Sequence, residues 1–302
     1  SDVCSSDLEM NAQMDIVSKA YESRPPSRHS LGLKPGEKSS WSVVGRGFVG
    51  LNITDKLFSE PISRVRTYSG RSKDPIKGDP HGTLVIAGAS SAKRLVNADP
   101  DRDMDDMQRL VEDVEGAEFD RLVLISSIDA GNPSIPYGRN RLWLERVMTD
   151  IGCTSIVRLP TLFGRGLRKN ILFDLVHKQL YSPLNVEDVH QWYDLTRLAD
   201  DIAMAPDGLT ELYPAPMGND ELVELLSESA AMREAKWAPP VSLDGGLFGS
   251  AKVAANRKWC RMSDPATAQV YDVVPKGGYL YGKDEVKRRM TKFVEGLIKF
   301  RR

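Results

Sequence analysis

Between residues 41 and 160, short apolar runs alternate with stretches in which apolar residues recur at helical spacing. The apolar runs, each suited to a strand buried in a parallel sheet, are residues 42–44, 64–68, 83–87, 121–125 and 154–159. Helical spacing of apolar positions is found in residues 49–57, 104–114 and 137–150. Strands that alternate with helices at this pitch predict an α/β fold with a doubly wound parallel sheet.

Beyond Pro160 the alternation gives way to mixed elements, which predicts a smaller C-terminal substrate-binding lobe over residues 161–302. One further strand is indicated at residues 209–213, and helical spacing at residues 219–235 and 286–297. The Lys and Arg residues of the last helix are typical of a solvated helix face rather than of a nucleic-acid-binding stripe.

Three segments stand apart from this pattern. The first eight residues resemble the in-frame translation of a sequencing-adapter oligonucleotide, so we interpret residues 1–8 as a cloning or assembly scar, with a disordered natural terminus as the alternative. Residues 9–40 form an N-terminal extension that ends in a linker-like composition of prolines and glycines among polar residues. Residues 235–275 are irregular, which is typical of long loops in a substrate lobe or, alternatively, of a partner-binding module.

The composition is that of an ordinary globular protein, with 41% hydrophobic and 27% charged residues over 302 positions and a formal net charge of −1. This balance gives no reason to expect a nucleic acid or an anionic membrane as partner. No apolar run is long enough to span a bilayer, and no signal-peptide core lies near the start. Three cysteines and four histidines, all widely spaced, predict neither a disulfide framework nor a metal site. We therefore expect a cytoplasmic protein without a metal.

The first strand runs directly into a glycine-rich turn with the spacing G-x-G-x-x-G, and a helix follows. This context predicts a Rossmann domain over residues 41–160 that binds a nicotinamide dinucleotide. The glycines permit the tight turn, let the backbone approach the pyrophosphate and let helix and strand pack closely, while the helix N-terminus holds the phosphates. The predicted cofactor contacts are Gly45, Arg46, Gly47, Phe48, Val49 and Gly50 in the turn, and Ala87, Gly88 and Ala89 after the third strand.

The end of the second strand bears on the choice between NAD and NADP. NAD selectivity usually comes from an acidic residue there, which binds the ribose hydroxyls, but this chain has Ser69 and Arg71 at that point. Arg46 and Arg71 carry guanidinium groups that match the geometry of a 2′-phosphate. We therefore predict NADP as the preferred cofactor, with NAD as the alternative and solvent exposure as the other interpretation of both arginines.

A candidate catalytic group follows the fourth strand, whose carboxyl end is where open α/β sheets bind ligands. Ser126 and Ser127 end that strand, and Tyr137 and Arg141 follow at a spacing of four residues, which places them on one helix face. A hydroxyl, a phenol and a fixed cation beside a nicotinamide would form a proton-transfer site, since the cation lowers the pKa of the phenol. The alternative is that Tyr137 only begins a core helix and Arg141 forms a surface pair.

At these residues the sequence resembles the extended short-chain dehydrogenase/reductase family, the NAD(P)-dependent sugar epimerases and dehydratases, and an atypical branch of it. The resemblance spans about residues 41–208. It rests on residues 45–50, 125–127, 137–141, 158–164, 167–174 and 192–202. The resemblance implies that Tyr137 is the acid/base, that Ser127 (or else Ser126) orients the substrate, and that the protein forms a homodimer.

The resemblance also implies that Pro160 and Leu162 line the nicotinamide and that Ser90, Arg168 and Asn170 face the substrate, although Arg168 and Asn170 fit surface positions equally well. Arg141 stands where the family has a lysine, and arginine does not release a proton at working pH. We therefore expect an NAD(P)-dependent epimerase, dehydratase or reductase acting on a nucleotide sugar or a similar small hydroxylated substrate. The alternative is a non-catalytic NADP-binding sensor or scaffold, because fold alone does not imply chemistry.

Overall fold

The computed structural model describes residues 40–60, 64–69, 76, 80–177, 188–237 and 279–299. The chain divides into two compact units, and each is described here by itself. The first unit contains Ser1–Pro160, Leu195–Leu212 and Pro275–Gly277, and the second contains Thr161–Asp194, Tyr213–Val274 and Gly278–Arg302. The division is therefore more interleaved than a single boundary after Pro160, because residues 195–212 return to the first unit.

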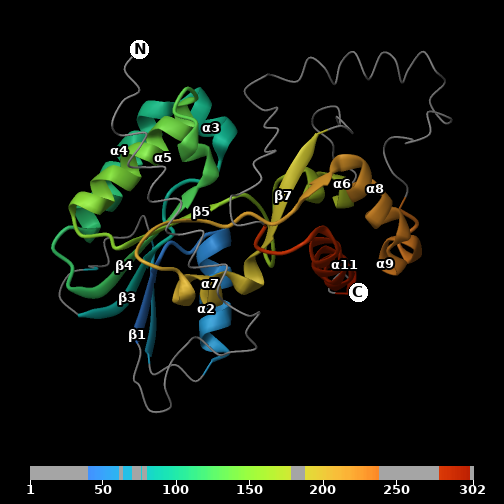
Figure 1. The fold of residues 1–302 in the computed structure, drawn as a ribbon, viewed down its shortest axis with the longest axis horizontal. Helices are drawn as coiled ribbons and strands as arrows, with labels where there is room; N and C mark the ends of the chain where they lie inside the picture. The colour runs from blue at the N-terminus through green and yellow to red at the C-terminus, as the bar shows by residue number, and fades with distance from the viewer. Residues whose placement is uncertain are drawn as a thin grey trace. The chain divides into compact units, whose positions relative to one another are not determined.

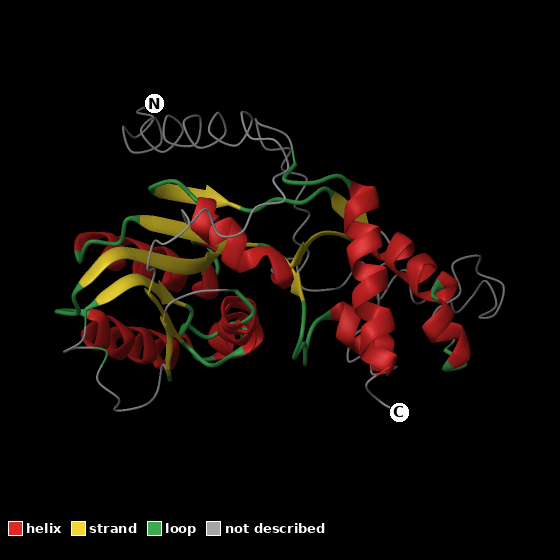
Figure 2. Ribbon diagram, turned by 90° about the horizontal axis from the view of Figure 1, so that it is seen from below, coloured by secondary structure: helices red, strands yellow, loops and turns green. Residues whose placement is uncertain are grey.

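The first unit is built on a parallel sheet with the strand order β2-β1-β3-β4-β5-β8 (Figures 1 and 2). Its strands are β1 (Ser40–Val44), β2 (Arg64–Tyr68), β3 (His81–Ile86), β4 (Phe119–Ser127), β5 (Ser155–Leu159) and β8 (Gly208–Glu211). The chain reverses its direction of travel across the sheet at β1, so the gap between β1 and β3 is a topological switch point, where such sheets bind ligands. The predicted doubly wound α/β fold is confirmed.

Helices cover both faces of this sheet. One face carries α3 (Lys93–Ala98), α4 (Pro100–Val114) and α5 (Pro136–Asp150), and the other carries α2 (Phe48–Phe58) with α7 (Leu198–Met204) (Figure 1). Two short 3₁₀ turns, η1 (Ile128–Gly131) and η2 (Leu195–Arg197), follow β4 and β7. The predicted positions of the strands agree with these bounds to within a few residues.

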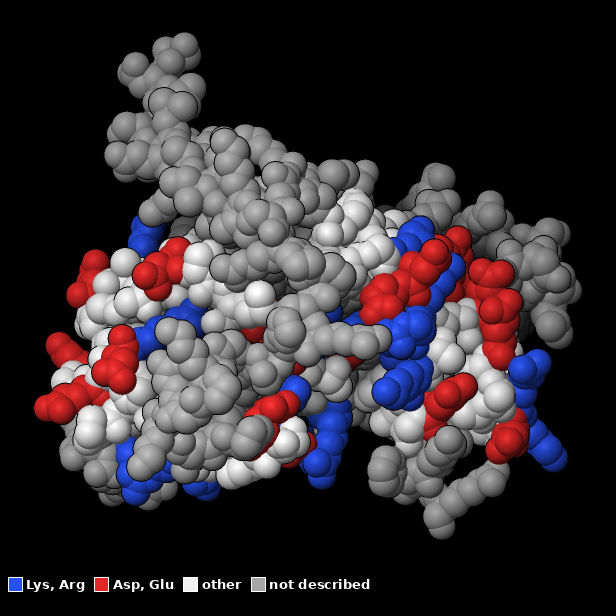
Figure 3. Space-filling view, turned by 60° about the horizontal axis from the view of Figure 1, so that its bottom comes forward, with Lys and Arg blue, Asp and Glu red and all other residues white. Residues whose placement is uncertain are grey.

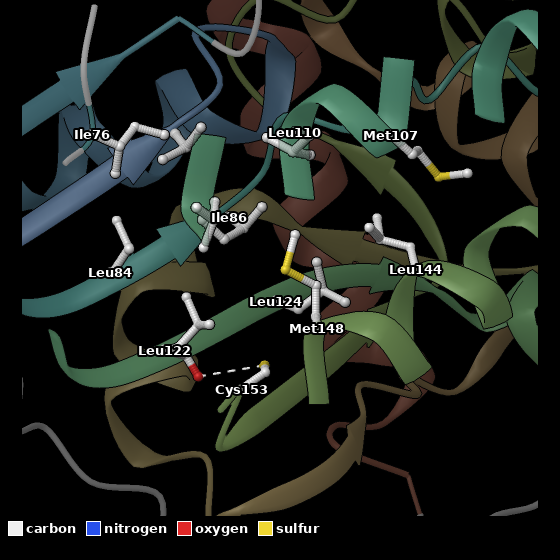
Figure 4. Packing of buried hydrophobic residues seen from close by; sticks show 12 residues of the cluster. Ile76, Leu84, Ile86, Met107, Leu110, Leu122, Leu124, Leu144, Met148 and Cys153 are labelled. Atoms are coloured by element: carbon white, nitrogen blue, oxygen red, sulfur yellow. Dashed lines mark hydrogen bonds between the residues drawn. The ribbon is translucent and has the colours of Figure 1, made fainter. Parts of the chain in front are cut away.

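The core on the α4 and α5 side consists of apolar side chains from the central strands and from the inner faces of the two helices (Figure 4). Leu84, Leu122 and Leu124 of the sheet are fully buried against Met107 of α4 and Met148 of α5. At about 25 cal/mol per Å² of buried apolar surface, each leucine contributes roughly 2 kcal/mol. These contacts hold α5, the helix that bears Tyr137, firmly against β4.

The second unit has a three-stranded sheet and four described helices. The strands are β6 (Thr161–Phe163), β7 (Val189–Asp194) and β9 (Pro216–Gly218), and the helices are α6 (Ile171–His177), α8 (Asn219–Glu228), α9 (Ala230–Glu234) and α11 (Lys283–Lys299). The helix predicted over residues 219–235 is interrupted at Ser229, where an extended backbone (φ −61°, ψ 125°) separates α8 from α9.

The charges of α11 are largely matched by acidic neighbours. Lys283 and Lys287 lie 2.8 and 3.0 Å from the Glu221 carboxylate, and Arg289 lies 3.0 Å from Asp194. Figure 3 shows basic and acidic side chains next to one another on the face that it draws. Among the described residues, no helix is long and apolar enough to cross a membrane.

Candidate functional site

The glycine-rich turn joins the carboxyl ends of three strands. Gly45 follows β1 with a φ of +110°, a conformation that residues other than glycine rarely adopt. Its N–H donates to the Tyr68 carbonyl at the end of β2, 2.8 Å away, and a Cβ at this position would overlap the Ala87 carbonyl after β3. A glycine is therefore required here for the close approach of the three strand ends.

The other two glycines of the motif have different surroundings. A Cβ on Gly50 would overlap the Gly45 carbonyl, so this glycine permits α2 to pack on the turn. Gly47 is the N-cap of α2, and a Cβ built on it would have no neighbour within 4 Å among the described residues. No side chain caps α2, and no acidic residue lies in its first turn. Open space at an uncapped helix N-terminus is what a diphosphate needs, because the N–H groups of Phe48 and Val49 begin the helix there. The turn therefore fits a dinucleotide.

Two of the residues predicted to choose between NAD and NADP, Arg46 and Ser69, are among the described residues. Arg46 is exposed, and its Nη2 donates to the Thr67 carbonyl near the end of β2, 2.9 Å away. Ser69 follows β2 and is half-buried. Arg71 lies outside the described residues. The preference for NADP stays a prediction.

The residue after β3 is still hydrogen-bonded to the end of β1. The Ala87 N–H donates to the Val44 carbonyl, 2.8 Å away, and Gly88, Ala89 and Ser90 follow, all half-buried. Because β1 and β3 are neighbours in the sheet, these residues border the glycine turn. The Ser90 carbonyl accepts a hydrogen bond from Arg141, so the backbone of Ser90 helps to hold the Arg141 side chain.

The structure brings Tyr137, Arg141 and Ser127 together, all within the first unit. Tyr137 lies in the first turn of α5, is 6% exposed, and its backbone N–H donates to the Asn97 side chain, 2.9 Å away. The Arg141 guanidinium lies over the Tyr137 ring, 4.7 Å from its centroid. Burial raises the pKa of the Tyr137 phenol, and Asp129 adds to this rise, while Arg141 and the Ser127 hydroxyl act to lower the pKa. The helix spacing of four residues explains the contact between Tyr137 and Arg141.

The Arg141 side chain is also bound by groups outside α5. It is 2% exposed, and its Nη2 lies 2.7 and 2.9 Å from the two carboxylate oxygens of Asp103 on α4. The Ser90 carbonyl and the Met107 sulfur accept its other hydrogen bonds, at 3.1 and 2.6 Å. All of these partners of the Arg141 cation are groups of the protein itself. The positive charge of Arg141 is thus compensated by Asp103.

The two serines that end β4 have different partners. The Ser126 hydroxyl donates to Glu145 over 2.6 Å, and Glu145 binds Arg158 through contacts of 2.8 and 2.7 Å, all in the interior. Ser127 is half-buried and pairs with Asp129 instead, because successive residues of a strand point to opposite sides. Of the two serines, Ser127 is therefore the one whose surroundings fit contact with a ligand.

Two charged residues near Ser127 were not singled out from the sequence. Asp129 in η1 accepts a hydrogen bond of 3.2 Å from the Ser127 hydroxyl, and Lys93 at the start of α3 lies 3.0 Å from the other Asp129 oxygen. The position of Asp129, two residues after Ser127, could have indicated it. Lys93 carries no such signal, since it is brought to Asp129 by the pairing of β3 with β4.

The remaining predicted residues are Pro160, which belongs to the first unit, and three residues of the second unit. Pro160 is buried at the end of the first unit, Leu162 is half-buried in β6, and Arg168 is exposed. Asn170 has a φ of +112°, and its side chain donates to the Leu162 carbonyl and accepts from the Phe173 N–H, at 2.8 and 3.1 Å. Asn170 thus caps α6, and the substrate roles of Arg168 and Asn170 stay predictions. The described residues contain no group of acidic, His and Cys side chains that could hold a metal ion.

Comparison with known proteins finds similarity only in structure. No protein-family model matches the chain. No curated protein matches it in sequence either. Among solved structures, a UDP-N-acetylglucosamine 4-epimerase from Methanobrevibacter ruminantium, in complex with UDP-N-acetylmuramic acid, superposes with a TM-score of 0.57 at 14% identity, covering 87% of this chain and 99% of that one.

Two other solved structures agree with this result. The protein MoeE5, in complex with UDP-glucose and NAD, has a TM-score of 0.54 at 16% identity and covers 74% of this chain and 99% of its own. A dTDP-glucose 4,6-dehydratase from Streptomyces venezuelae with NAD bound has a TM-score of 0.52 at 15% identity and covers 74% and 97%. The chain therefore shares the Rossmann-type fold of NAD-dependent epimerases and dehydratases, and the predicted resemblance is confirmed at the level of the fold.

Proposed function

We propose that this chain is an NAD(P)-dependent enzyme of the epimerase, dehydratase or reductase type, acting on a nucleotide sugar or a similar hydroxylated substrate. The observation that carries the proposal is the convergence of Tyr137, Ser127 and Arg141 at the same edge of the parallel sheet as the glycine turn. Neighbouring strands lie about 4.8 Å apart, so the ends of β1 and β4 are separated by roughly 10 Å, a span that one dinucleotide can bridge.

The cofactor contacts follow from the turn. Gly45, Gly47 and Gly50 form the cradle for the diphosphate, and the first N–H groups of α2 hold its oxygens. Arg46, held beside the end of β2, supplies a cation for a 2′-phosphate, which supports NADP over NAD. When bound, the nicotinamide supplies hydride transfer to and from a substrate carbon.

The protein's own part is proton transfer. Tyr137 takes the proton of a substrate hydroxyl when the carbon is oxidised, and returns it when the carbon is reduced. Ser127 orients that hydroxyl by hydrogen bonding. Arg141 favours the ionised phenol from one face of the ring, although its charge is shared with Asp103. Burial excludes water from Tyr137, which strengthens each of these interactions.

Cofactor binding and turnover of the full chain test the proposal in two stages. Isothermal titration calorimetry with NADP and with NAD measures the two dissociation constants. Addition of UDP- and dTDP-sugars then tests for reduction of the bound cofactor by its absorbance. We expect Tyr137→Phe to reduce turnover by at least about a hundredfold and to leave the NADP dissociation constant unchanged. Equal turnover in this variant would remove Tyr137 from the mechanism.

A second candidate function is that of a non-catalytic NADP-binding sensor. The burial of Tyr137 and the pairing of Arg141 with Asp103 favour it, because both reduce the tendency of the phenol to give up its proton. NADP binding without cofactor reduction by any sugar nucleotide would support the sensor. Absence of binding to either dinucleotide would exclude both candidates.

A further inference from the structure

An ion pair that the proposed proton transfer does not use lies beside Ser127. Lys93 Nζ and Asp129 Oδ1 are 3.0 Å apart, with side chains 25% and 11% exposed. The other carboxylate oxygen of Asp129 accepts a hydrogen bond from the Ser127 hydroxyl, and the Asp129 N–H donates to the same hydroxyl oxygen, both at 3.2 Å. Lys93, Asp129 and Ser127 therefore form a continuous chain of polar contacts that ends at the candidate site.

The pair bridges two strands of the sheet. Lys93 begins α3, after the loop that follows β3, and Asp129 lies in η1 directly after β4. Because β3 and β4 are hydrogen-bonded neighbours, their carboxyl ends hold both residues at the edge that carries the glycine turn. A partly buried pair of this kind is screened less by solvent than a surface pair, so its charges act on nearby groups.

Charged groups from four elements are linked to Tyr137, two of them directly and two through an ion pair. Arg141 of α5 lies against the ring, and Asp103 of α4 compensates it with two contacts below 3 Å. Asp129 of η1 is the acidic group that acts directly on the phenol, and Lys93 of α3 is bound to it. Arg141 acts to lower the pKa of the phenol and Asp129 acts to raise it, so Lys93 can affect Tyr137 through the Asp129 carboxylate that it binds.

We propose that Lys93 is a positioning residue, which holds Asp129 against Ser127 and offsets the negative charge that Asp129 places next to Tyr137. The role rests on the proposed function, since it gives the pair a purpose in proton transfer at Tyr137. Without Lys93, the Asp129 carboxylate would repel the ionised phenol more strongly and would lose one of the contacts that orient it. With Lys93 in place, Ser127 keeps one orientation and the phenol can ionise at lower cost.

Tyrosine ionisation in the cofactor-free protein tests this role. The full chain is labelled with ¹³C at the tyrosine ζ carbon, and the signal lost in Tyr137→Phe assigns Tyr137. Lys93→Met should raise the pH midpoint of that signal by about one unit, and Asp129→Asn should lower it by a similar amount, as expected for single charges near a buried group. Lys93→Arg keeps the charge and should titrate like the wild type.

The two substitutions must shift the midpoint in opposite directions. Shifts of the same sign, or a midpoint that stays in place in a folded Lys93→Met protein, would overturn the role of the pair. If Lys93→Met does not fold, Lys93→Gln replaces it. The wild-type phenol could stay protonated up to the pH at which the protein unfolds. In that case the Tyr137 midpoint in Asp129→Asn must lie below the unfolding pH, and a midpoint that does not would overturn the role of the pair.

This measurement separates the ion pair from the proposed function. Because no cofactor is present, the opposite shifts can be observed even in a protein that binds no dinucleotide, which would refute the proposed function alone. Unmoved midpoints in a protein that binds NADP would overturn the ion pair's role alone.

Discussion

The substitution Gly47→Val separates the folding role of the glycine turn from its proposed binding role. Gly47 has a φ of −85° and a ψ of −169°, a conformation open to any residue, and a Cβ there would meet no atom of the part of the chain that the structure describes within 4 Å. The valine side chain would instead occupy the open space in front of the first turn of α2. The change should therefore be tolerated by the protein alone and harmful to cofactor binding.

The two effects differ in size. Glycine is a better N-cap than valine, so the loss of folding stability should be about 1 kcal/mol or less. A phosphate oxygen must come within about 3 Å of a backbone N–H to form a hydrogen bond, and the valine methyl groups would block that approach. Loss of two such charge-assisted hydrogen bonds at about 1.5–3 kcal/mol each weakens binding by at least about 3 kcal/mol, or roughly 150-fold in the dissociation constant.

Gly282 offers a matched control. It precedes α11, and its carbonyl accepts the Val286 N–H as in a helix N-cap. A Cβ there would also have no neighbour within 4 Å in the described ranges. Gly282→Val should lose as little stability as Gly47→Val but bind NADP normally. Gly50→Ala, by contrast, would place a Cβ on the Gly45 carbonyl and should destabilise the protein by about 3 kcal/mol.

Calorimetric titration with NADP and thermal unfolding by circular dichroism measure both effects on the same preparations. A Gly47→Val protein that binds NADP with the wild-type dissociation constant would refute the reasoning, because the diphosphate could not then lie against this turn. A Gly47→Val protein that is unfolded would show that the space in front of α2 is needed for packing.

Three further predictions concern specificity, acid stability and the core. Arg46→Ala should weaken NADP binding by about 30-fold and leave NAD binding unchanged in parallel titrations, and equal losses for both cofactors would contradict a 2′-phosphate contact. Burial acts to raise the pKa of Glu221, but its hydrogen bonds, first that from Lys283, outweigh it and lower the pKa to about 2. The ionised Glu221 carboxylate therefore stabilises the fold by about 1–2 kcal/mol after solvent screening, above about pH 4.5, and this stabilisation is lost as the pH falls towards 2. Glu221→Gln should flatten the acid limb of a stability-versus-pH curve. Glu145→Gln should cost about 3 kcal/mol in urea unfolding because it leaves the buried Arg158 charge less compensated, and a loss below about 1 kcal/mol would contradict this.

Local chemistry explains why the elements of the first unit could be predicted. A strand buried on both faces needs a short run of apolar residues, and β1, β3 and β4 each have one. The glycine turn depends on residues only five positions apart, so its requirement is visible in the chain itself. The contact of Tyr137 with Arg141 likewise follows from helical spacing alone.

The chain beyond Pro160 was harder to predict because its elements depend on contacts with distant parts of the sequence. Nothing in the composition of residues 219–235 marks the break at Ser229, since helical spacing continues through it. The return of residues 195–212 to the first unit depends on the pairing of β8 with β5, which are far apart in the sequence. Long-range pairing of this kind leaves no periodic signal.

The sequence by itself determined the doubly wound sheet, the glycine turn and the presence of a serine, a tyrosine and a cation after the fourth strand. Only the tertiary structure decided how those groups are charged and oriented. It paired Arg141 with Asp103 across 38 positions of the chain and Ser126 with Glu145 across 19, and it brought Lys93 to Asp129. The reason is physical: periodicity records which side of an element is buried, whereas the partner of a buried charge depends on which element packs against it.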